Sequence, residues 1–267
     1  MGIGHYENFP VASLLLPPRF RAPVALIYRF AREADDFADE GDAPGPVRLG
    51  QLERFRDQLR KIALGQAPDI PWFAELAAVI RQHELPIDAF SDLLSAFAQD
   101  VTQQRYADAA EVLDYCRRSA NPIGRLLLKL FQRASEENIR WSDQICSALQ
   151  LVNFWQDVAI DYAKNRVYLP RNEMRRYGVT EAHIAEQRCD DAWRGLIRFQ
   201  IERARGMLLE GAPLGRVLPG RIGLEIRATV QGGLRILEKI ERARYDVFRE
   251  RPVLRWYDWP LIMARTL

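Results

Sequence analysis

Two pairs of aspartates have a spacing that could hold a divalent cation. Asp35 and Asp39 are four residues apart, and Asp157 and Asp161 repeat this spacing. On an α-helix, residues at positions i and i+4 lie on the same face. Two adjacent carboxylates repel each other and are costly to bury unless a cation lies between them. Mg²⁺ suits such ligands, because it takes one or two carboxylates and completes its shell with water and phosphate oxygens.

The first pair belongs to a polar stripe on a helix that we expect over residues 21–40. Tyr28, Arg32, Asp35 and Asp39 follow one another at positions i, i+4, i+7 and i+11. This spacing places all four side chains on one face. The rest of the segment is apolar nearly all round, which is typical of a buried helix. We therefore expect the stripe to face a polar cavity rather than bulk water.

The second pair has a similar setting. Asn153 shares one helical face with Asp157 and Asp161, and the neighbouring residues are mostly apolar. Two cations and a hydroxyl follow shortly afterwards: Lys164, Arg166 and Tyr168. They are close enough in sequence to reach a diphosphate held between the two acidic pairs.

A third pair shows that the spacing alone is not diagnostic. Asp88 and Asp92 are also four residues apart, but they follow Pro86 at an expected helix start. Carboxylates at that place favour the positive end of the helix dipole. We interpret this pair as capping and solvated residues. The other two pairs differ because each lies within an apolar helix and has Arg or Asn on the same face.

The hydrophobic pattern predicts an all-α fold. Long stretches carry apolar residues at spacings of three and four, while alternating strand-like runs are scarce. Short Pro/Gly segments separate these stretches, and none is long enough or Ser-rich enough to be a linker between domains. With 267 residues, of which 48% are hydrophobic, the chain can bury one large core. We therefore expect a single domain over residues 1–267.

The composition excludes several classes of protein. The formal net charge is +2, from 38 basic and 36 acidic residues without a basic tail or stripe, so nothing indicates a nucleic-acid partner. Cys116, Cys146 and Cys189 lie far apart without a His cluster, which favours neither a zinc site nor a disulfide framework. Such cysteine usage fits a reducing cytoplasm.

Membrane contact is expected to be peripheral at most. No stretch approaches the roughly 20 apolar residues of a membrane span. Residues 254–262 concentrate aromatic side chains, which could dock on lipid or pack on the body of the domain. We expect a cytoplasmic protein with possible contact to the inner face of the membrane.

The two aspartate segments resemble the two motifs of a known family. Residues 28–39 resemble the first aspartate motif of the squalene/phytoene synthase family, and residues 156–161 with 166–170 resemble the second. Residues 104–106 and 115–116 fit as well, and the resemblance covers about residues 5–250. It implies an all-α isoprenoid-synthase helical bundle with a central active-site cavity, Mg²⁺ as cofactor and a farnesyl-derived substrate.

Departures from the usual family pattern point to one branch. Family members commonly have Arg where this chain has Gln156, and Val-Ala-Gly where it has Ser119-Ala120-Asn121. With the opening over residues 7–12, these features are similar to the bacterial hydroxysqualene synthases of hopanoid and squalene biosynthesis. The resemblance implies conversion of presqualene diphosphate and water into hydroxysqualene and diphosphate. It also implies partners in an upstream presqualene diphosphate synthase and a downstream reductase.

The resemblance assigns roles to the residues named above. The four aspartates would bind Mg²⁺, and Arg32, Lys164 or Arg166 would assist departure of the diphosphate. Gln156 can hold a water without adding positive charge near a carbocation, so we predict that Gln156 and Asn121 position the water. Alternatively, Gln156 only supports its helix and Asn121 caps the next one. Aromatic residues expected around the cavity are Phe9, Phe30, Phe131, Phe154 and Trp155.

Two other functions remain open at this stage. The first is a head-to-head prenyl synthase that makes presqualene diphosphate, squalene or phytoene. The second is a non-catalytic helical assembly factor of the same fold. The presence of all four aspartates argues against the second, because each lost ligand would weaken Mg²⁺ binding directly.

Overall fold

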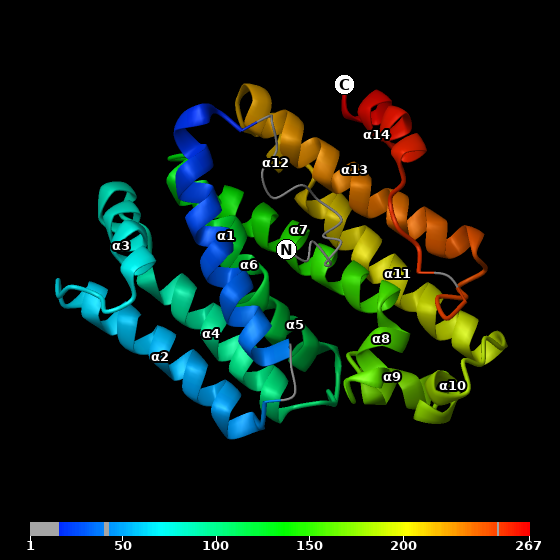
Figure 1. The fold of residues 1–267 in the computed structure, drawn as a ribbon. Coiled ribbons are helices and arrows are strands. Elements are labelled where there is room, and N and C mark those ends of the chain that lie inside the picture. Colours follow the sequence, from blue (N-terminus) through cyan, green and yellow to red (C-terminus); the bar gives the residue numbers. More distant parts are fainter. Residues whose placement is uncertain (1–15, 40–42, 250) are drawn as a thin grey trace.

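The computed structural model describes residues 16–39, 43–249 and 251–267, and this part of the chain is built from helices (Figure 1). Its only sheet-like pairing is an isolated parallel bridge between Arg105 and Val167. This confirms the prediction of an all-α fold. The helices of the first half are α1 (Pro18–Asp39), α2 (Gly45–Ala63), α3 (Pro71–His83), α4 (Ile87–Thr102), α5 (Ala109–Ser119) and α6 (Asn121–Leu130). Those that follow are α7 (Glu136–Gln156), α8 (Val158–Ala163), α9 (Arg171–Arg176), α10 (Glu181–Ala185), α11 (Asp191–Gly211), α12 (Leu214–Val217), α13 (Gly220–Arg242), the 3₁₀ turn η1 (Trp256–Asp258) and α14 (Trp259–Thr266).

Helix α1 carries the first aspartate pair and packs against α2, α3, α4 and α6. It begins three residues before the predicted helix, at Pro18, and ends at Asp39. Its buried residues follow the helical period: Phe20, Val24, Ile27, Phe30, Ala34 and Ala38. This stripe anchors α1 in the core. Tyr28, Arg32, Asp35 and Asp39 lie elsewhere on the helix and are only partly buried.

Helix α7 carries the second aspartate motif and lies along α11 (Figure 1). The two helices approach closely at Gly211, where an added Cβ would stand 2.6 Å from the backbone oxygen of Trp141. Real Cβ atoms essentially never come this close, so the packing requires glycine here. Helix α6 makes a similar approach at Gly124, whose Cβ would stand 2.2 Å from Oγ of Ser142. Small residues thus fix α7 between its neighbours.

The second motif is not one continuous helix, and this corrects the sequence interpretation. Helix α7 ends at Gln156, and Asp157 separates it from α8 with φ −105° and ψ 12°. Asp157 takes part in both helices, because its N–H donates to Asn153 O at the end of α7 (2.9 Å) and its carbonyl accepts from Asp161 N at the start of α8 (2.8 Å). The motif therefore bends at Asp157, and Asn153 and Asp161 lie on different helices.

The aromatic residues that we expected to line the cavity lie in different parts of the structure. Phe30 packs away from the aspartates in a cluster with Phe55, Phe73 and Phe90, at centroid distances of 5.1–5.9 Å. Phe131 contacts Phe20 at 5.0 Å. Phe154 stacks on Tyr168 at 3.7 Å, and Trp155 is buried; Phe9 and the opening motif lie outside the described residues.

No helix among the described residues is long and apolar enough to cross a membrane.

Candidate active site

The loop after α8 brings the second aspartate motif against the end of α1. Arg166 bonds Asp39 through Nη1 at 2.5 Å, and Lys164 Nζ lies 3.4 Å from the other oxygen of the same carboxylate. The Arg166 side chain is only 9% exposed, so its end of the ion pair is largely shielded from water. The backbone N–H of Arg166 also donates to the carbonyl of Asp161. The two predicted diphosphate ligands thus lie beside both acidic pairs.

Asp35 has a strongly perturbed acidity. The Asp35 side chain keeps 36% of its surface exposed. Its carboxylate is nevertheless surrounded by protein atoms on most sides, and in this sense it is buried. This burial, followed by the negative charges of Asp39 and Asp100, raises the pKa of Asp35 to about 7. Arg32 opposes the shift only weakly, because its guanidinium is 3.7 Å from Asp35 and bonds Asp36 more closely at 2.8 Å. Asp35 therefore lacks sufficient positive charge nearby.

Asp161 also lacks sufficient positive charge nearby. Burial and then the negative charge of Asp157 raise the pKa of Asp161 to about 8, and Asp39 adds to the effect. Arg166 and Lys164 lower it without cancelling the rise. Because Asp39 acts on both Asp35 and Asp161, the two motifs form one electrostatic unit.

Asp157 has a partner that the sequence analysis missed. The guanidinium of Arg251 forks onto its carboxylate, with Nε on Oδ1 and Nη2 on Oδ2 at 2.9 Å. The family resemblance ended at about residue 250, and nothing in the local spacing links two residues 94 positions apart. Such a bidentate pair is geometrically specific, and the same fork suits a phosphate group.

A second missed residue, Asp100, lies behind the site on α4. It is 4% exposed and accepts hydrogen bonds from the hydroxyls of Tyr115 (2.5 Å) and Tyr168 (2.9 Å). Burial raises the pKa of Asp100 to about 6, although Arg166 lowers it. Tyr168, which we predicted to contact the diphosphate, directs its hydroxyl to Asp100 instead of into open space. A pocket of about 190 Å³ adjoins Asp100 and is also lined by Arg48, Lys164 and Arg166.

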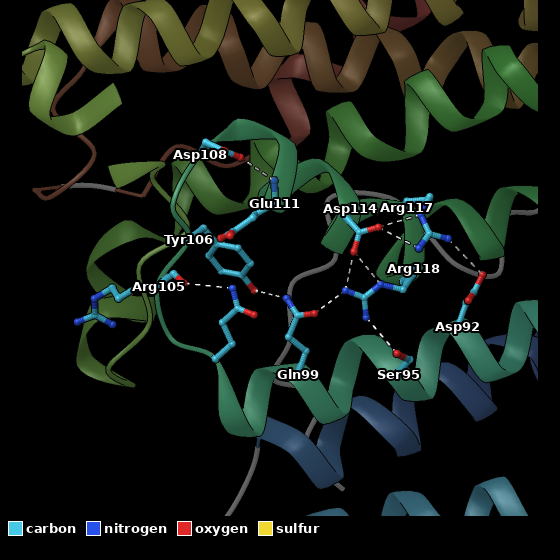
Figure 2. A network of polar contacts seen from close by, with 11 residues as sticks. Asp92, Ser95, Gln99, Arg105, Tyr106, Asp108, Glu111, Asp114, Arg117 and Arg118 are labelled. Atoms are coloured by element: carbon cyan, nitrogen blue, oxygen red, sulfur yellow. Dashed lines mark hydrogen bonds and ion pairs between the residues drawn. The ribbon is translucent and has the colours of Figure 1, made fainter. Parts of the chain in front are cut away.

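A polar network holds the elements around Asp100 (Figure 2). Arg118 of α5 bonds Gln99 of α4 and donates to Ser95 Oγ at 3.1 Å. Gln99 in turn donates to the hydroxyl of Tyr106 at 3.4 Å, and the Tyr106 ring stacks on Tyr168 at 5.4 Å. The network includes Asp92, which lies 4.0 Å from Arg117. Asp88 is in the first turn of α4, as predicted for the third aspartate pair.

The carboxylates fit Mg²⁺ by their chemistry rather than by a closed preformed shell. Only oxygen ligands are present at the two motifs, which is the donor set that Mg²⁺ prefers. Within the described residues, no three metal-binding side chains are already gathered closely enough to hold an ion. Guanidinium and ammonium groups cover Asp39 and Asp157 instead. The raised pKa values of Asp35 and Asp161 indicate that these two carboxylates still need a cation.

A protein-family comparison agrees with this geometry. The squalene/phytoene synthase model matches residues 4–258. The chain belongs to the squalene/phytoene synthase family. This confirms the family predicted from the aspartate motifs, whose members include enzymes of isoprenoid biosynthesis.

Relatives of this family member include hydroxysqualene synthases and phytoene synthases. A hydroxysqualene synthase from Rhodopseudomonas palustris is 36% identical over 224 residues, covering 82% of this chain and 74% of that protein. Another from Zymomonas mobilis is 33% identical over 259 residues, covering 94% and 84%. A phytoene synthase from Arthrospira platensis is 29% identical over 258 residues, covering 92% and 83%.

Solved structures show the same fold. The crystal structure of a squalene synthase from Alicyclobacillus acidocaldarius has a TM-score of 0.84 and 35% identity, with 90% of both chains covered. A dehydrosqualene synthase with a bound ligand also gives 0.84, at 23% identity, and covers 94% of this chain and 87% of the other. The second match supports the fold alone.

The two residues predicted to position a water have defined contacts in this family member. Gln156 is 2% exposed, and its side-chain amide donates to the carbonyl of Pro252. Asn121 is 5% exposed and accepts a 2.8 Å hydrogen bond from Ser147 Oγ. Asn121 is the first residue of α6 after the N-cap Ala120, and no side-chain capping bond is present, so the capping alternative is wrong.

The remaining predicted ligands lie on the expected helices. Tyr28 is two turns before Asp35 on α1, and Asn153 is in the last turn of α7; both are partly buried. Their roles as substrate ligands stay predictions.

Proposed function

We propose that this protein is a hydroxysqualene synthase, which converts presqualene diphosphate and water into hydroxysqualene and diphosphate. The observation that carries the proposal is the convergence of two carboxylate pairs, short of positive charge, with Lys164, Arg166 and Arg251. In a Mg²⁺-diphosphate complex, carboxylates can bind the metal, and guanidinium and ammonium groups can bind the phosphate oxygens. The names of the relatives at 33–36% identity support the particular reaction.

In this proposal the chain's own residues bind and orient the diphosphate. Asp35, Asp39, Asp157 and Asp161 would hold Mg²⁺, which when bound neutralises charge on the departing diphosphate. Arg166 and Arg251 would share their guanidinium groups between the carboxylates and the phosphate oxygens. Loss of diphosphate leaves a cyclopropylcarbinyl cation on the substrate.

The wall beside the acidic site suits such a cation. Phe154 and Tyr168 stack at 3.7 Å with an interplanar angle of 7°, and both line a small hollow with Asp161 and Arg166. Aromatic faces attract cations, and their bulk keeps bulk water away. Tyr168 is itself fixed by Asp100, so the wall is held in place.

The water that captures the carbocation needs polar side chains near this wall to hold it. Gln156 remains our proposed water-positioning residue. Asn121 bonds Ser147, which lies nine residues before Gln156 on α7, about 13 Å along the helix, so Asn121 would have to hold a different water. Trp155, next to Gln156 in the chain, is buried, and its indole N–H has no hydrogen-bond partner among the described residues. One ordered water would satisfy that donor. The oxonium formed on capture loses its proton to released diphosphate or to water.

The presence of phytoene synthases among the relatives makes a head-to-head prenyl synthase the second candidate. One experiment separates the two. Purified protein is incubated with Mg²⁺ and either presqualene diphosphate or farnesyl diphosphate, without reductant, and the extracted products are identified. We expect hydroxysqualene from presqualene diphosphate. Formation of presqualene diphosphate from farnesyl diphosphate would assign the second function.

Two controls make the result specific. Asp161→Asn should abolish turnover, whereas Asp88→Asn, at the exposed member of the third aspartate pair, should leave it unchanged. No turnover of either substrate or of geranylgeranyl diphosphate would favour the non-catalytic assembly factor and overturn the proposal.

A further inference from the structure

The C-terminal turn and helix bury two polar side chains and expose several large apolar ones. Their buried positions are Asp258, Ile262 and Thr266, one turn apart, and this stripe packs on α13 (Figure 1). Asp258 is 0% exposed and is held by Arg235 at 2.7 Å and Lys239 at 2.5 Å. Ion pairs thus fix the turn to α13.

The outward positions are mainly large and apolar. The exposed ones are Trp256 (83%), Tyr257 (49%), Trp259 (36%), Leu261 (36%) and Leu267 (91%). We call these five residues the C-terminal patch. The rings of Trp256 and Tyr257 are in contact at 5.9 Å, and Leu261 is one turn beyond Tyr257. A surface helix normally shows the opposite arrangement. A gathered exposed apolar patch indicates an interaction surface.

Basic side chains outnumber acidic ones around the C-terminal patch, where Arg235, Lys239, Arg255 and Arg265 stand against Glu238 and Asp258. Over residues 251–267 the only acidic side chain is Asp258, which is buried, whereas Arg255 and Arg265 are exposed. Arg265 bonds Glu238 at 2.5 Å, and Lys239 lies 5.1 Å from the Tyr257 ring centre. The rim of the patch therefore presents guanidinium groups, which complement an anionic surface.

We propose that the C-terminal patch docks this protein on an anionic lipid bilayer. Trp and Tyr prefer the boundary between headgroups and acyl chains, and flanking Arg residues add attraction to anionic lipid. The eight residues of α14 are far fewer than the roughly 20 needed to cross a membrane, so the helix lies along the surface.

A second copy of the chain fits the patch less well. In a two-fold dimer built on this patch, the rim arginines of the two copies would approach each other. Stable interfaces also use roughly 20–30 residues a side, many more than the patch supplies.

The docked surface is connected directly to the active site. Trp256 follows Arg251 by five residues, and the intervening segment is tied to the site by Arg251 on Asp157 and Pro252 on Gln156. Lys239 also holds this segment through the carbonyl of Val253 at 2.7 Å. If the proposed function holds, the segment that contacts Asp157 and Gln156 also leads to the surface that meets the phase in which a long isoprenoid chain dissolves.

Vesicle co-sedimentation of the full chain tests the proposal. Vesicles of phosphatidylglycerol and phosphatidylcholine are compared with vesicles of phosphatidylcholine alone at low salt. We expect binding to the anionic vesicles that weakens as salt rises. Trp256→Glu should lower the partition coefficient by about tenfold or more, and Arg255→Gln by about fivefold, the effect of one basic residue near such a surface.

The matched control is Leu64→Glu, because Leu64 is 72% exposed at the end of α2, on the opposite side of the bundle in Figure 1. This variant should bind vesicles like the wild type, and thermal melting should show that all variants are folded. Equal binding to both vesicle types, no binding by the wild type, or equal binding by every variant would overturn the proposal. Gel filtration in which Trp256→Glu dissociates a dimer would assign the patch to a second copy instead. Turnover of presqualene diphosphate in detergent tests the proposed function separately, since it does not require vesicle binding.

Discussion

The raised pKa of Asp161 predicts that replacing this residue stabilises the metal-free protein at alkaline pH. The folded-state pKa is about 8, against an ordinary value of 3.8, so the folded protein retains a proton that the unfolded chain releases. Between these two values, stability therefore falls as pH rises. Asp161→Asn keeps the shape of the side chain and removes both the buried charge and its repulsion with Asp157.

The size of the effect follows from the difference of about four pH units. At about 1.4 kcal/mol for each unit the ceiling is about 6 kcal/mol, and water reaching this partly buried side chain reduces it to roughly 2–3 kcal/mol. For a chain of this size, that corresponds to a rise of roughly 5–10 °C in Tm. The gain should be full at pH 8.5 and should fall to roughly two-fifths of that value at pH 5.5, because the loss of wild-type stability accumulates over the whole interval between pH 3.8 and about 8.

Differential scanning calorimetry from pH 5.5 to 8.5 in the presence of a chelator measures this gain. Mg²⁺ added together with pyrophosphate should raise the Tm of the wild type at pH 8 more than that of the variant. Asp88→Asn, at the exposed member of the third pair, is the control and should show no pH-dependent gain. A variant Tm below that of the wild type at pH 8.5, or a difference independent of pH, would refute the electrostatic account of the site.

Three further substitutions test other contacts. Arg251→Gln should weaken binding of Mg²⁺-pyrophosphate by about tenfold in titration calorimetry, because a charge-assisted fork is lost, whereas Arg249→Gln, at a side chain 89% exposed, should not. Gln156→Leu should change the ratio of hydroxysqualene to eliminated or rearranged products in chromatography of the extracts; an unaltered profile would contradict a role in water capture. Gly211→Ala should destabilise the protein by about 1–3 kcal/mol in urea unfolding, since its Cβ would meet the α7 backbone at 2.6 Å. Gly206→Ala, on the same helix with nothing within 4 Å, should be neutral or stabilising, and an equal loss at both positions would contradict the packing argument.

The helices could be predicted because the relevant pattern is local. Apolar residues at spacings of three and four record which face of a segment is buried, and this is sufficient for the fold class. The bend at Asp157 was missed because no Gly or Pro marks it in the sequence. The carboxylate there is paired with Arg251, a contact that depends on the tertiary fold.

Prediction of the site from the sequence was limited in the same way. The aspartate pairs were found by their spacing, but Asp100 is a single carboxylate whose tyrosine partners come from other elements. One sequence signal could have found it. Asp100 continues the buried stripe of α4 formed by Leu93 and Phe97, so a charge stands where the helical period requires an apolar residue. A buried carboxylate at such a position needs partners, and Tyr115 and Tyr168 supply them.

The placement of charge explains why this site should bind metal and diphosphate together rather than in succession. Without ligands, Arg166 and Lys164 cover Asp39, and Arg251 covers Asp157, so cations of the chain occupy the carboxylates that the metal would use. Mg²⁺ alone would have to displace these cations, leaving guanidinium groups partly buried without an anion, which is unfavourable. A diphosphate arriving with Mg²⁺ gives each guanidinium a new anionic partner as its carboxylate turns to the metal. Under the proposed function, the site would be complementary to a metal-diphosphate complex, in which the metal takes the carboxylates and the phosphate oxygens take the guanidinium groups.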